Sequence, residues 1–346
     1  MSNVPLAGPA ISVVMPTYND GAYLREAIDS ILGQTFKDFE FIIINDGSTD
    51  DTEDIINSYR DNRIKYLKNE TNCGNTVTRN RGMNAAMGKY IAIMDSDDIS
   101  VPKRLAIQYE YLEKHPEIGI LGGQIIFFDK NSWYYTHYPK DPAYVKSFMF
   151  FKNPVAQPTV MLRTKILSGY NLSYNTEYES GGDYDLWYRA ALSGVSIANL
   201  SKILLHYRQS GNQMSHPSNT IARVETLKSY SRDKLSTLGL VFDDADFIML
   251  HHFVRGRVEV SSEQYKLLDN LLKRIFEANK QNRIFDNIPF RAVIFSHRLR
   301  LIKYAFLEKK NFPAFAWMCI QLAAETGFSS LWQYWRNEGK NFLAGS

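Results

Sequence analysis

The sequence predicts an α/β protein in two parts: a Rossmann-like sheet flanked by helices, followed by a mostly helical region. Three observations predict this class. Short apolar runs alternate with helical patterns through the first half of the chain, polar clusters follow those runs, and the pattern turns helical from Ile221 onward. A chain of 346 residues exceeds one typical domain, so we expect one large and one smaller domain.

The predicted elements of the first half alternate strictly. Continuous apolar runs predict buried strands, and apolar residues at helical spacing predict helices. The strands span 11–15, 39–44, 64–67 and 90–94, and the helices span 23–32, 52–59 and 76–87. This alternation implies parallel strands joined by crossover helices.

The next segments are predicted to extend the sheet and to build a second wall beside it. A helix is predicted to start near Ser100, with Ser100 as its cap and Pro102 in its first turn. Periodicity breaks at 216–219, so we predict a sheet domain over 1–218 and a mostly α-helical domain over 219–346. The further predicted elements are strands at 118–128, 159–162 and 203–207 and a helix at 183–193.

Composition excludes several classes of protein. The two cysteines, Cys73 and Cys319, lie far apart, which argues against a disulfide framework or a zinc site and fits a reducing compartment. The start of the chain lacks the charged leader and long apolar core of a secretory signal. The best apolar run, 312–324, is shorter than the ~20 residues that span a bilayer. We therefore expect a cytoplasmic protein that is not integral to a membrane.

Three polar clusters follow predicted strands, at 16–20, 45–50 and 95–98. Parallel sheets bind ligands at the carboxyl ends of their strands, so these clusters predict one crevice. Asp95 and Asp97 suit a hard divalent cation such as Mg2+ or Mn2+, because such ions prefer oxygen ligands and often take one or two carboxylates plus substrate phosphates. For Asp98 the preferred interpretation is a cap on the following helix.

No glycine-rich phosphate loop follows the first strand, where the sequence reads Pro-Thr-Tyr-Asn. Dinucleotide oxidoreductases and P-loop enzymes are therefore disfavoured. Phosphate charge would instead be neutralised by the metal and by arginines such as Arg79, Arg81 or Arg208. The alternative for each arginine is a solvated ion pair, and we prefer that alternative for Arg81.

The motifs VVMPTYND, INDGSTD, TRNRGMNAAMGKYIAIMDSDD, GGDYDLWYRA and YRQSGNQMS, in this order and spacing, resemble those of the family 2 glycosyltransferases of the GT-A fold. The resemblance covers roughly residues 11–215 and leaves the region after Ile221 out. It implies a GT-A catalytic domain that takes a nucleotide sugar, UDP-linked, and inverts the anomeric centre.

The resemblance assigns a donor pocket residue by residue. Thr17 and Tyr18, next to Pro16, match the loop that lines the nucleotide base. Asp46 matches the acidic residue that accepts a hydrogen bond from the uracil ring. Arg79 matches the family arginine of the nucleotide pocket.

The remaining assignments concern the diphosphate and the reaction. Asp95 and Asp97 match the DxD pair that handles the ribose and the metal-bound diphosphate. Ser96 and Arg208 complete the predicted contacts to the nucleotide sugar. Asp183 matches the base of the family's Glu-Asp motif.

The assigned residue types fit the chemistry of sugar transfer. The leaving diphosphate needs its growing negative charge stabilised, and the attacking hydroxyl needs a general base. One base and no enzyme nucleophile give single displacement with inversion. The alternative for Asp183 is a purely structural role as the N-cap of its helix. Asp185 is expected to be structural.

Three positions depart from the common family pattern. Gly182 stands where many relatives have Glu, which puts acceptor binding in question. Ser210 stands where many have His, so Gln213 or Arg208 could contact the diphosphate instead. Gln157 replaces the common His on the acceptor side.

The C-terminal region carries an excess of positive charge. From Ile221 onward it has 19 Lys and Arg against 13 Asp and Glu. Within it, the apolar residues Ala292, Phe295, Leu299, Ile302 and Phe306 form a helical stripe flanked by basic residues. Such a helix can lie on an anionic membrane surface, where a lipid-linked acceptor is found, or can face a core with its basic side in water.

The sequence therefore predicts a metal-dependent glycosyltransferase that extends a surface polysaccharide or glycolipid, in the cytoplasm or at the inner face of the membrane. Two alternatives stay open: a sugar nucleotidyltransferase, and a protein that binds a nucleotide sugar without turnover. Nucleic-acid binding is not expected, because the basic residues form no recognisable module. Trp317, Trp332 and Trp335 fit either an interfacial anchor or a contact in a homo-oligomer.

Overall fold

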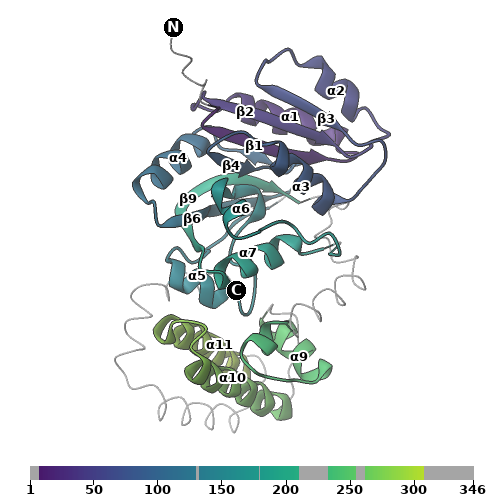
Figure 1. The fold of residues 1–346 in the computed structure, drawn as a ribbon. Helices are drawn as coiled ribbons and strands as arrows, with labels where there is room; N and C mark the ends of the chain where they lie inside the picture. Colours follow the sequence, from purple (N-terminus) through teal and green to yellow (C-terminus); the bar gives the residue numbers. More distant parts are fainter. Residues whose placement is uncertain (1–7, 130–131, 179, 210–232, 255–261, 308–346) are drawn as a thin grey trace. The chain divides into compact units, whose positions relative to one another are not determined.

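The computed structural model describes residues 8–129, 132–178, 180–209, 233–254 and 262–307, and Figure 1 draws these as ribbons. The chain divides into two compact units, Met1–Lys140 with Val155–Arg223, and Asp141–Pro154 with Val224–Ser346. The segment 141–154, which the predicted division assigns to the first region, thus belongs with the C-terminal helices. Several predicted features lie outside the described residues, namely the boundary at residue 218, Ser210, Gln213, Trp317, Trp332 and Trp335.

The first unit opens with the predicted alternation of strands and helices. Three of the four strands in this alternation are buried along their whole length, as expected for parallel strands covered on both faces. Its first helix buries a stripe of Leu24, Ala27, Ile28 and Ile31. The elements are β1 (Ile11–Thr17), α1 (Gly21–Leu32), β2 (Phe39–Asn45), α2 (Thr52–Ser58), β3 (Ile64–Lys68), α3 (Asn75–Ala85) and β4 (Tyr90–Ile93). These strands and helices of the sequence prediction are confirmed.

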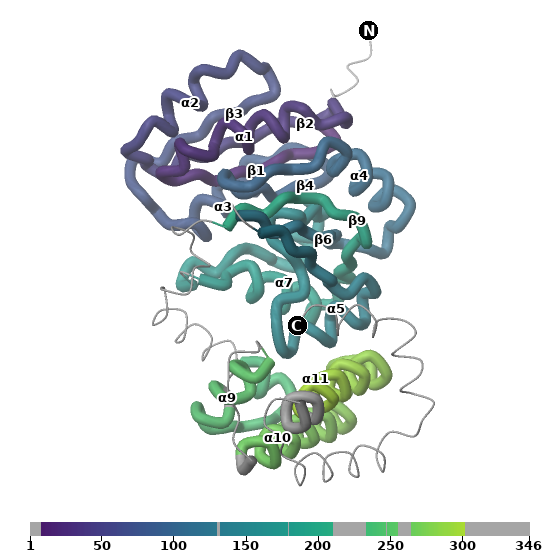
Figure 2. Tube along the Cα trace, turned by 180° about the vertical axis from the view of Figure 1, so that it is seen from behind, coloured from purple at the N-terminus to yellow at the C-terminus, as the bar shows by residue number. Residues whose placement is uncertain are grey.

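The second part of this unit adds antiparallel strands and further helices. Its elements are β5 (Ile99–Ser100), α4 (Arg104–Lys114), β6 (Ile118–Phe128), β7 (Trp133–Tyr135), η1 (Gln157–Thr159), β8 (Met161–Arg163), α6 (Lys165–Gly169), α7 (Gly182–Leu192) and β9 (Ser196–Arg208). Among the described residues the nine strands form one mixed sheet in the order β3-β2-β1-β4-β8-β6-β9-β5, with β7 paired to β6. Figure 2 shows β9 and β6 running beside each other, in agreement with their parallel pairing.

The predicted helix start at Ser100 is wrong. Ser100 lies in β5, where it pairs with Leu205 of β9, and α4 begins only at Arg104. The predicted capping role of Asp98 is also wrong, because Lys103 is the residue before the first turn and Asp98 accepts a hydrogen bond from the Arg208 backbone N–H at 2.9 Å. A partner more than a hundred positions away in the sequence decides the backbone here, and no local pattern reveals it.

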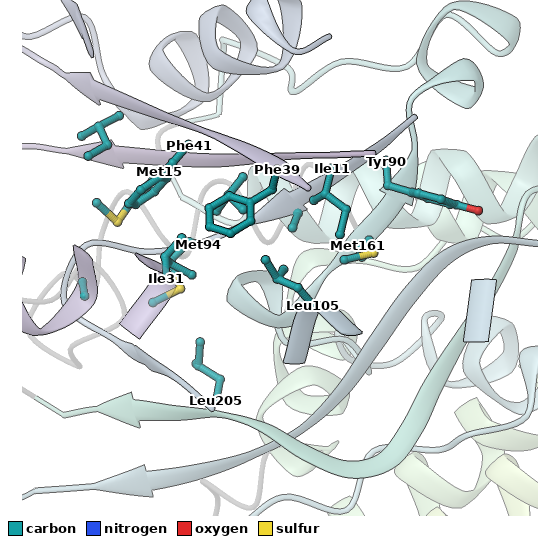
Figure 3. Packing of buried hydrophobic residues seen from close by; sticks show 14 of the residues in the cluster. Ile11, Met15, Ile31, Phe39, Phe41, Tyr90, Met94, Leu105, Met161 and Leu205 are labelled. Atoms are coloured by element: carbon teal, nitrogen blue, oxygen red, sulfur yellow. The ribbon is translucent and has the colours of Figure 1, made fainter. Parts of the chain in front are cut away.

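One hydrophobic core underlies the sheet. In Figure 3 the labelled side chains of Ile11, Met15, Phe39 and Phe41 point toward Met94 and Leu105, so strand and helix side chains interdigitate. Burial of such a cluster is the main favourable term in folding. It fixes β1, β2 and β4, whose carboxyl ends carry the polar clusters.

The second unit contains α5 (Pro142–Phe148), α9 (Asp244–Val254), α10 (Ser262–Asn282) and α11 (Asn287–Leu307). Figure 1 shows α10 and α11 side by side. Phe150 and Phe151 each lie within about 6 Å of the Phe290 ring, measured between ring centroids at 5.8 and 6.2 Å. These contacts tie 141–154 to the C-terminal helices.

Arg298, one of the basic residues predicted to flank the apolar stripe of α11, does not face solvent. Val293, Phe295 and His297 are all buried, and Arg298 is buried as well, with its Nε 2.6 Å from the Asp269 carboxylate of α10. This part of the helix is therefore core around its circumference, as favoured for a helix that is apolar on more than one face. Within the described ranges, no helix is both long enough and apolar enough to cross a membrane.

Candidate active site

The three polar clusters meet at one edge of the sheet. β1 lies between β2 and β4, parallel to both, and Thr17 is in register with Asn45. The Asp46 backbone N–H donates to the Thr17 carbonyl at 2.9 Å. The carboxyl ends of these strands thus bring together the segments that the sequence analysis placed in one crevice.

Asp46 is buried and holds the loop that leads into α3. Its carboxylate accepts hydrogen bonds from Asn69 Nδ2 at 2.7 Å, from the Cys73 backbone N–H at 2.9 Å and from the Gly74 backbone N–H at 3.0 Å. Gly74 has φ of +88°, a conformation that glycine adopts at little cost. Asn69 was missed in the sequence, although it follows the third predicted strand in the same way as the other clusters follow theirs.

The last residues of β1 and the residue after it differ in exposure. Pro16 and Thr17 are buried in the strand, and Thr17 Oγ1 has no hydrogen-bond partner among the described residues. Tyr18 is 42% exposed, so its ring is open to a ligand. A planar base can stack on such a ring.

Arg79 forms an ion pair with Asp95 across the site. Arg79 Nη2 lies 2.5 Å from Asp95 Oδ1, and both side chains are largely buried. Burial alone would lower the pKa of Arg79, but the charges of Asp95 and Asp183 and the bond to Asp95 raise it above its ordinary value. The guanidinium therefore stays charged, and its carbon lies 5.9 Å from the centre of the Tyr174 ring.

Ser96 and Asp97 are tied to other elements. The Ser96 hydroxyl donates to the Asp20 carboxylate, which joins the β1 and β4 loops. Asp97 is half-buried, and its backbone carbonyl accepts from Arg208 Nε at 2.9 Å. Both residues thus sit in a segment that is fixed from two sides.

Arg208 ends β9 and is clamped in place. Its guanidinium carbon lies 4.7 Å from the Tyr23 ring centre and 4.8 Å from the Phe128 ring centre. Its Nη2 also lies 2.8 Å from Glu26. Arginine stacked in this way is held rigidly beside residues 95–98, here called the acidic loop.

Arg104 is a buried cation that the sequence analysis missed. Its Nη2 donates to the Ile93 carbonyl at 2.7 Å, and its Nε donates to Gln108 Oε1 at 3.1 Å. Burial lowers the pKa of Arg104 to about 9, against the opposing charges of Asp95 and Asp98, so the group remains protonated at neutral pH. Arg104 and Gln108 share one helix face at i, i+4, which was the only local signal for this pair.

The loop of residues 95–98 contains one fully buried carboxyl group. Asp98 is fully buried, and burial, followed by the charges of Asp97 and Asp95, raises its pKa well above the ordinary value. Within the described chain, no group of three or more His, Cys, Asp or Glu side chains is arranged to hold a metal. Asp95 and Asp97 alone still fit Mg2+ or Mn2+, because such ions take one or two carboxylates and complete their shell with phosphate oxygens.

Asp183 lies in the first turn of α7. The residue before that turn is Gly181, with φ of +75°, so the interpretation of Asp183 as the N-cap is wrong. Burial raises the pKa of the Asp183 carboxyl group, the charge of Arg79 lowers it, and the net direction is upward. Asp185 instead pairs with Arg189 one turn later at 2.7 Å, which agrees with its expected structural role.

The departures from the family pattern have local explanations. A Cβ atom at Gly182 would lie 2.9 Å from Thr76 Cγ2 of α3, so the threonine methyl already fills this space. Gln157 is buried and donates from Nε2 to the Tyr174 hydroxyl at 2.7 Å. Tyr174, which the sequence analysis also missed, thereby connects η1 to the neighbourhood of Arg79.

Comparisons with known proteins agree on one family. The family model described as Glycosyl transferase family 2 matches residues 12–178. An uncharacterized glycosyltransferase of Methanocaldococcus jannaschii is 37% identical over 237 residues, which cover 66% of this chain and 79% of that protein.

Solved structures share the fold at low sequence identity. TarS 1-349 of S. aureus in complex with UDP-GlcNAc matches with a TM-score of 0.58 and 20% identity, over 92% of this chain and 93% of that one. The mannosyltransferase PcManGT from Pyrobaculum calidifontis in complex with GDP-Man and Mn2+ matches with a TM-score of 0.50 and 14% identity, over 99% and 89%. The predicted GT-A fold with C-terminal helices is thus confirmed, and the chain is a glycosyltransferase that belongs to family 2.

Proposed function

We propose that this glycosyltransferase transfers a sugar from a UDP-linked donor to a hydroxyl of a glycan or lipid-linked glycan, with inversion at the anomeric carbon. The observation that carries the proposal is the position of Arg79. It pairs with Asp95 at 2.5 Å, and the charge of Asp183 also acts on it. Both the donor-side acidic residue and the candidate base act on one guanidinium, which supports a shared site for the donor and the acceptor hydroxyl.

Asp183 is the proposed general base. Its carboxylate takes the proton of the acceptor hydroxyl while that oxygen bonds to the anomeric carbon. The bond from this carbon to the diphosphate breaks, and its electron pair leaves with UDP. Burial raises the pKa of Asp183 and so strengthens it as a base, while Arg79 limits the rise.

Asp95 and Asp97 are the proposed protein ligands of a divalent cation. Bound there with the diphosphate, Mn2+ or Mg2+ supplies positive charge that stabilises the leaving group. The Mn2+ in the complex of PcManGT supports this assignment by fold analogy. Arg208 lies at the same loop and is proposed to add positive charge toward the diphosphate.

The nucleotide is proposed to lie against Tyr18, with Thr17 and Asp46 facing the base. An ionised carboxylate offers about four acceptor sites. Three are used by Asn69, Cys73 and Gly74, which leaves one for a ring N–H of uracil. The complex of TarS with UDP-GlcNAc supports a UDP-linked donor.

The proposed setting is surface polysaccharide synthesis at the inner face of the membrane. The excess of Lys and Arg after Ile221, 19 against 13 acidic residues, supports attraction to anionic lipid headgroups. A lipid-linked acceptor would be presented at that surface.

The test measures UDP release from a panel of UDP-sugars and GDP-mannose, with Mn2+ or with EDTA. We expect Mn2+-dependent release from a UDP-sugar, its loss in Asp97→Ala, and a fall in kcat of about 10²- to 10⁴-fold in Asp183→Asn. Asp185→Asn is the matched control, because it removes a carboxylate from the same helix without touching the site. Equal activity of the Asp183→Asn and Asp185→Asn variants would exclude Asp183 as the base.

A further inference from the structure

Aromatic side chains are unusually exposed on the β6–β7 hairpin. Trp133 is 62% exposed and Tyr134 is 46% exposed, although both lie in a paired strand. Successive residues of a strand point to opposite faces, so these two rings serve different surfaces. Large exposed rings of this kind mark ligand-binding surfaces more often than scattered single residues do.

Tyr134 is held as a flat platform. Its ring stacks on Phe127 of β6 with centroids 4.6 Å apart and planes 19° apart. Phe127 is in turn supported by Tyr207 of β9, with centroids 5.0 Å apart. Gln209 Nε2 donates to the Tyr134 hydroxyl at 2.7 Å, so the ring is fixed on one face and at its tip while it remains exposed.

Tyr138 follows the same hairpin and is fixed against β6. Its backbone is fixed by Gln124, whose Oε1 accepts from the Tyr138 N–H at 2.7 Å and whose Nε2 donates to the Tyr138 carbonyl at 3.2 Å. Burial, then the charges of Asp183 and Tyr134, raise the pKa of Tyr138, which places it within electrostatic reach of both. Arg208, which follows Tyr207 in β9, pairs with Phe128 and donates from Nε to the Asp97 carbonyl at 2.9 Å, so the hairpin lies at the end of β9 that reaches the candidate site.

We propose that Tyr134 and Tyr138, here called the tyrosine pair, form the subsite that binds a pyranose ring of the acceptor. A pyranose presents a face of C–H groups that packs on an aromatic ring, while its hydroxyls reach water or polar partners. A rigid tyrosine binds such a ring at a small entropy cost. This inference rests on the proposed function, because it requires Asp183 to receive an acceptor hydroxyl.

The hairpin supplies its own control. Trp133 is more exposed than Tyr134 and stacks on Phe128 with centroids 5.5 Å apart, on the opposite face. Trp133→Ala therefore removes an exposed ring from the same strand without touching the tyrosine pair. Tyr134→Phe keeps the ring and removes only the hydroxyl that Gln209 holds.

The test is saturation-transfer NMR on the full chain with UDP and Mn2+. The probes are the methyl α- and β-pyranosides of glucose, galactose, mannose and N-acetylglucosamine, with glycerol as a probe that has hydroxyls but no ring face. At least one pyranoside should bind, and Tyr134→Ala should weaken its binding by about ten-fold. Trp133→Ala and Tyr134→Phe should bind within about two-fold of the wild type, and glycerol should give no signal.

Two results overturn the inference: no pyranoside binds the wild type, or binding survives in Tyr134→Ala. UDP binding, read in the same samples, separates this failure from failure of the proposed function. If UDP binds and the pyranosides do not depend on Tyr134, only the subsite is wrong. If UDP itself does not bind, the proposed donor is wrong.

Discussion

At the scale of single residues, the carboxyl group of Asp98 is electrostatically unfavourable when it is charged inside the folded protein. It is fully buried, and burial with the charges of Asp97 and Asp95 raises its pKa well above the ordinary value. A carboxyl group whose pKa is higher in the folded than in the unfolded state disfavours folding as pH rises through that interval. The group therefore destabilises the metal-free protein at neutral pH and not in acid.

We predict that Asp98→Asn raises the melting temperature of the metal-free protein at pH 7. The amide oxygen can still accept from the Arg208 backbone N–H, while the buried charge is gone. The gain should shrink as pH falls and vanish below about pH 4, the ordinary range for aspartate. Calorimetry in EDTA from about pH 3 to pH 8 measures it, and a gain that does not change with pH would contradict the assigned cause.

A second residue-scale prediction concerns the family departure at Gly182. Gly182→Ala places a methyl group 2.9 Å from Thr76 Cγ2, so the Thr76 side chain or the first turn of α7, which carries Asp183, must shift. Because small misplacements of reacting groups are costly, we expect kcat/KM to fall roughly ten-fold. The double variant with Thr76→Ser, which removes only the crowding methyl, should recover to within about three-fold.

Steady-state transfer kinetics measure both variants, with Thr76→Ser alone as the control for the lost methyl. Full activity of the single Gly182→Ala variant would show that this contact does not position α7. The same crowding gives a reason why Gly182 stands here in place of a glutamate: Thr76 occupies the space.

At the scale of elements, Gln34 joins the end of α1 to β5 and α4. Its fully buried amide donates to the Val101 carbonyl at 2.8 Å and to Ser100 Oγ at 3.2 Å, and its Oε1 accepts from the Leu105 N–H at 3.1 Å. These bonds anchor the segment that directly follows Asp98. The acidic loop thus depends on a glutamine that lies outside it.

We predict that Gln34→Ala lowers the free energy of unfolding by about 3 kcal/mol, because it leaves several buried backbone groups without partners. Ser30→Ala removes one bond to the same segment, from the Ser100 N–H at 3.1 Å, and should cost about 1 kcal/mol. Urea denaturation gives both values. If the two variants lose the same free energy of unfolding, the hydrogen bonds of Gln34 together contribute no more than the single bond of Ser30.

The elements that could be predicted are those whose own sequence shows a clear apolar run or a helical stripe. The apolar runs of β1, β2 and β4 and the stripe of α1 were located within two residues of their ends. β5 could not be predicted, since it is two residues long and exists because Ser100 pairs with Leu205. The first half of β9, from Ser196, is interrupted by polar residues and was missed for a similar reason.

The candidate site was predicted to a similar degree. Family motifs and strand ends located Asp46, Arg79 and Asp95, and the structure brings Arg79 and Asp95 into contact. Arg104 and Tyr174 escaped prediction, because their importance depends on burial and on partners far away in the sequence. The assigned roles in donor binding and catalysis stay predictions.

At the scale of the whole molecule, the second unit is built from two separate parts of the chain. The segment 141–154 contributes Phe148, Phe150 and Phe151, all buried, and Phe150 contacts both Phe285 and Phe290. Helix α11 also packs on α5. A division of the chain near residue 218 therefore does not separate the two units.

We predict that a protein truncated after residue 218 is insoluble or aggregates, because it keeps these three phenylalanines without their partners. Replacing Phe150 and Phe151 by Ser in the truncated protein should increase its soluble fraction several-fold. The soluble yield and light scattering after purification measure this. If the truncated protein is soluble without the replacements, the two parts are less interdependent than their contacts indicate.

The two-part construction of the second unit also bears on how such genes can change. A single recombination event near residue 220 would replace the C-terminal helices but keep the original segment 141–154. The aromatic side chains of that segment would then not match the new α11. Exchange of the whole unit needs two further crossovers, on either side of that segment. Substitutions in 148–151 and in 285–297 should therefore co-vary among close relatives, as a lineage that alters one side must repair the other.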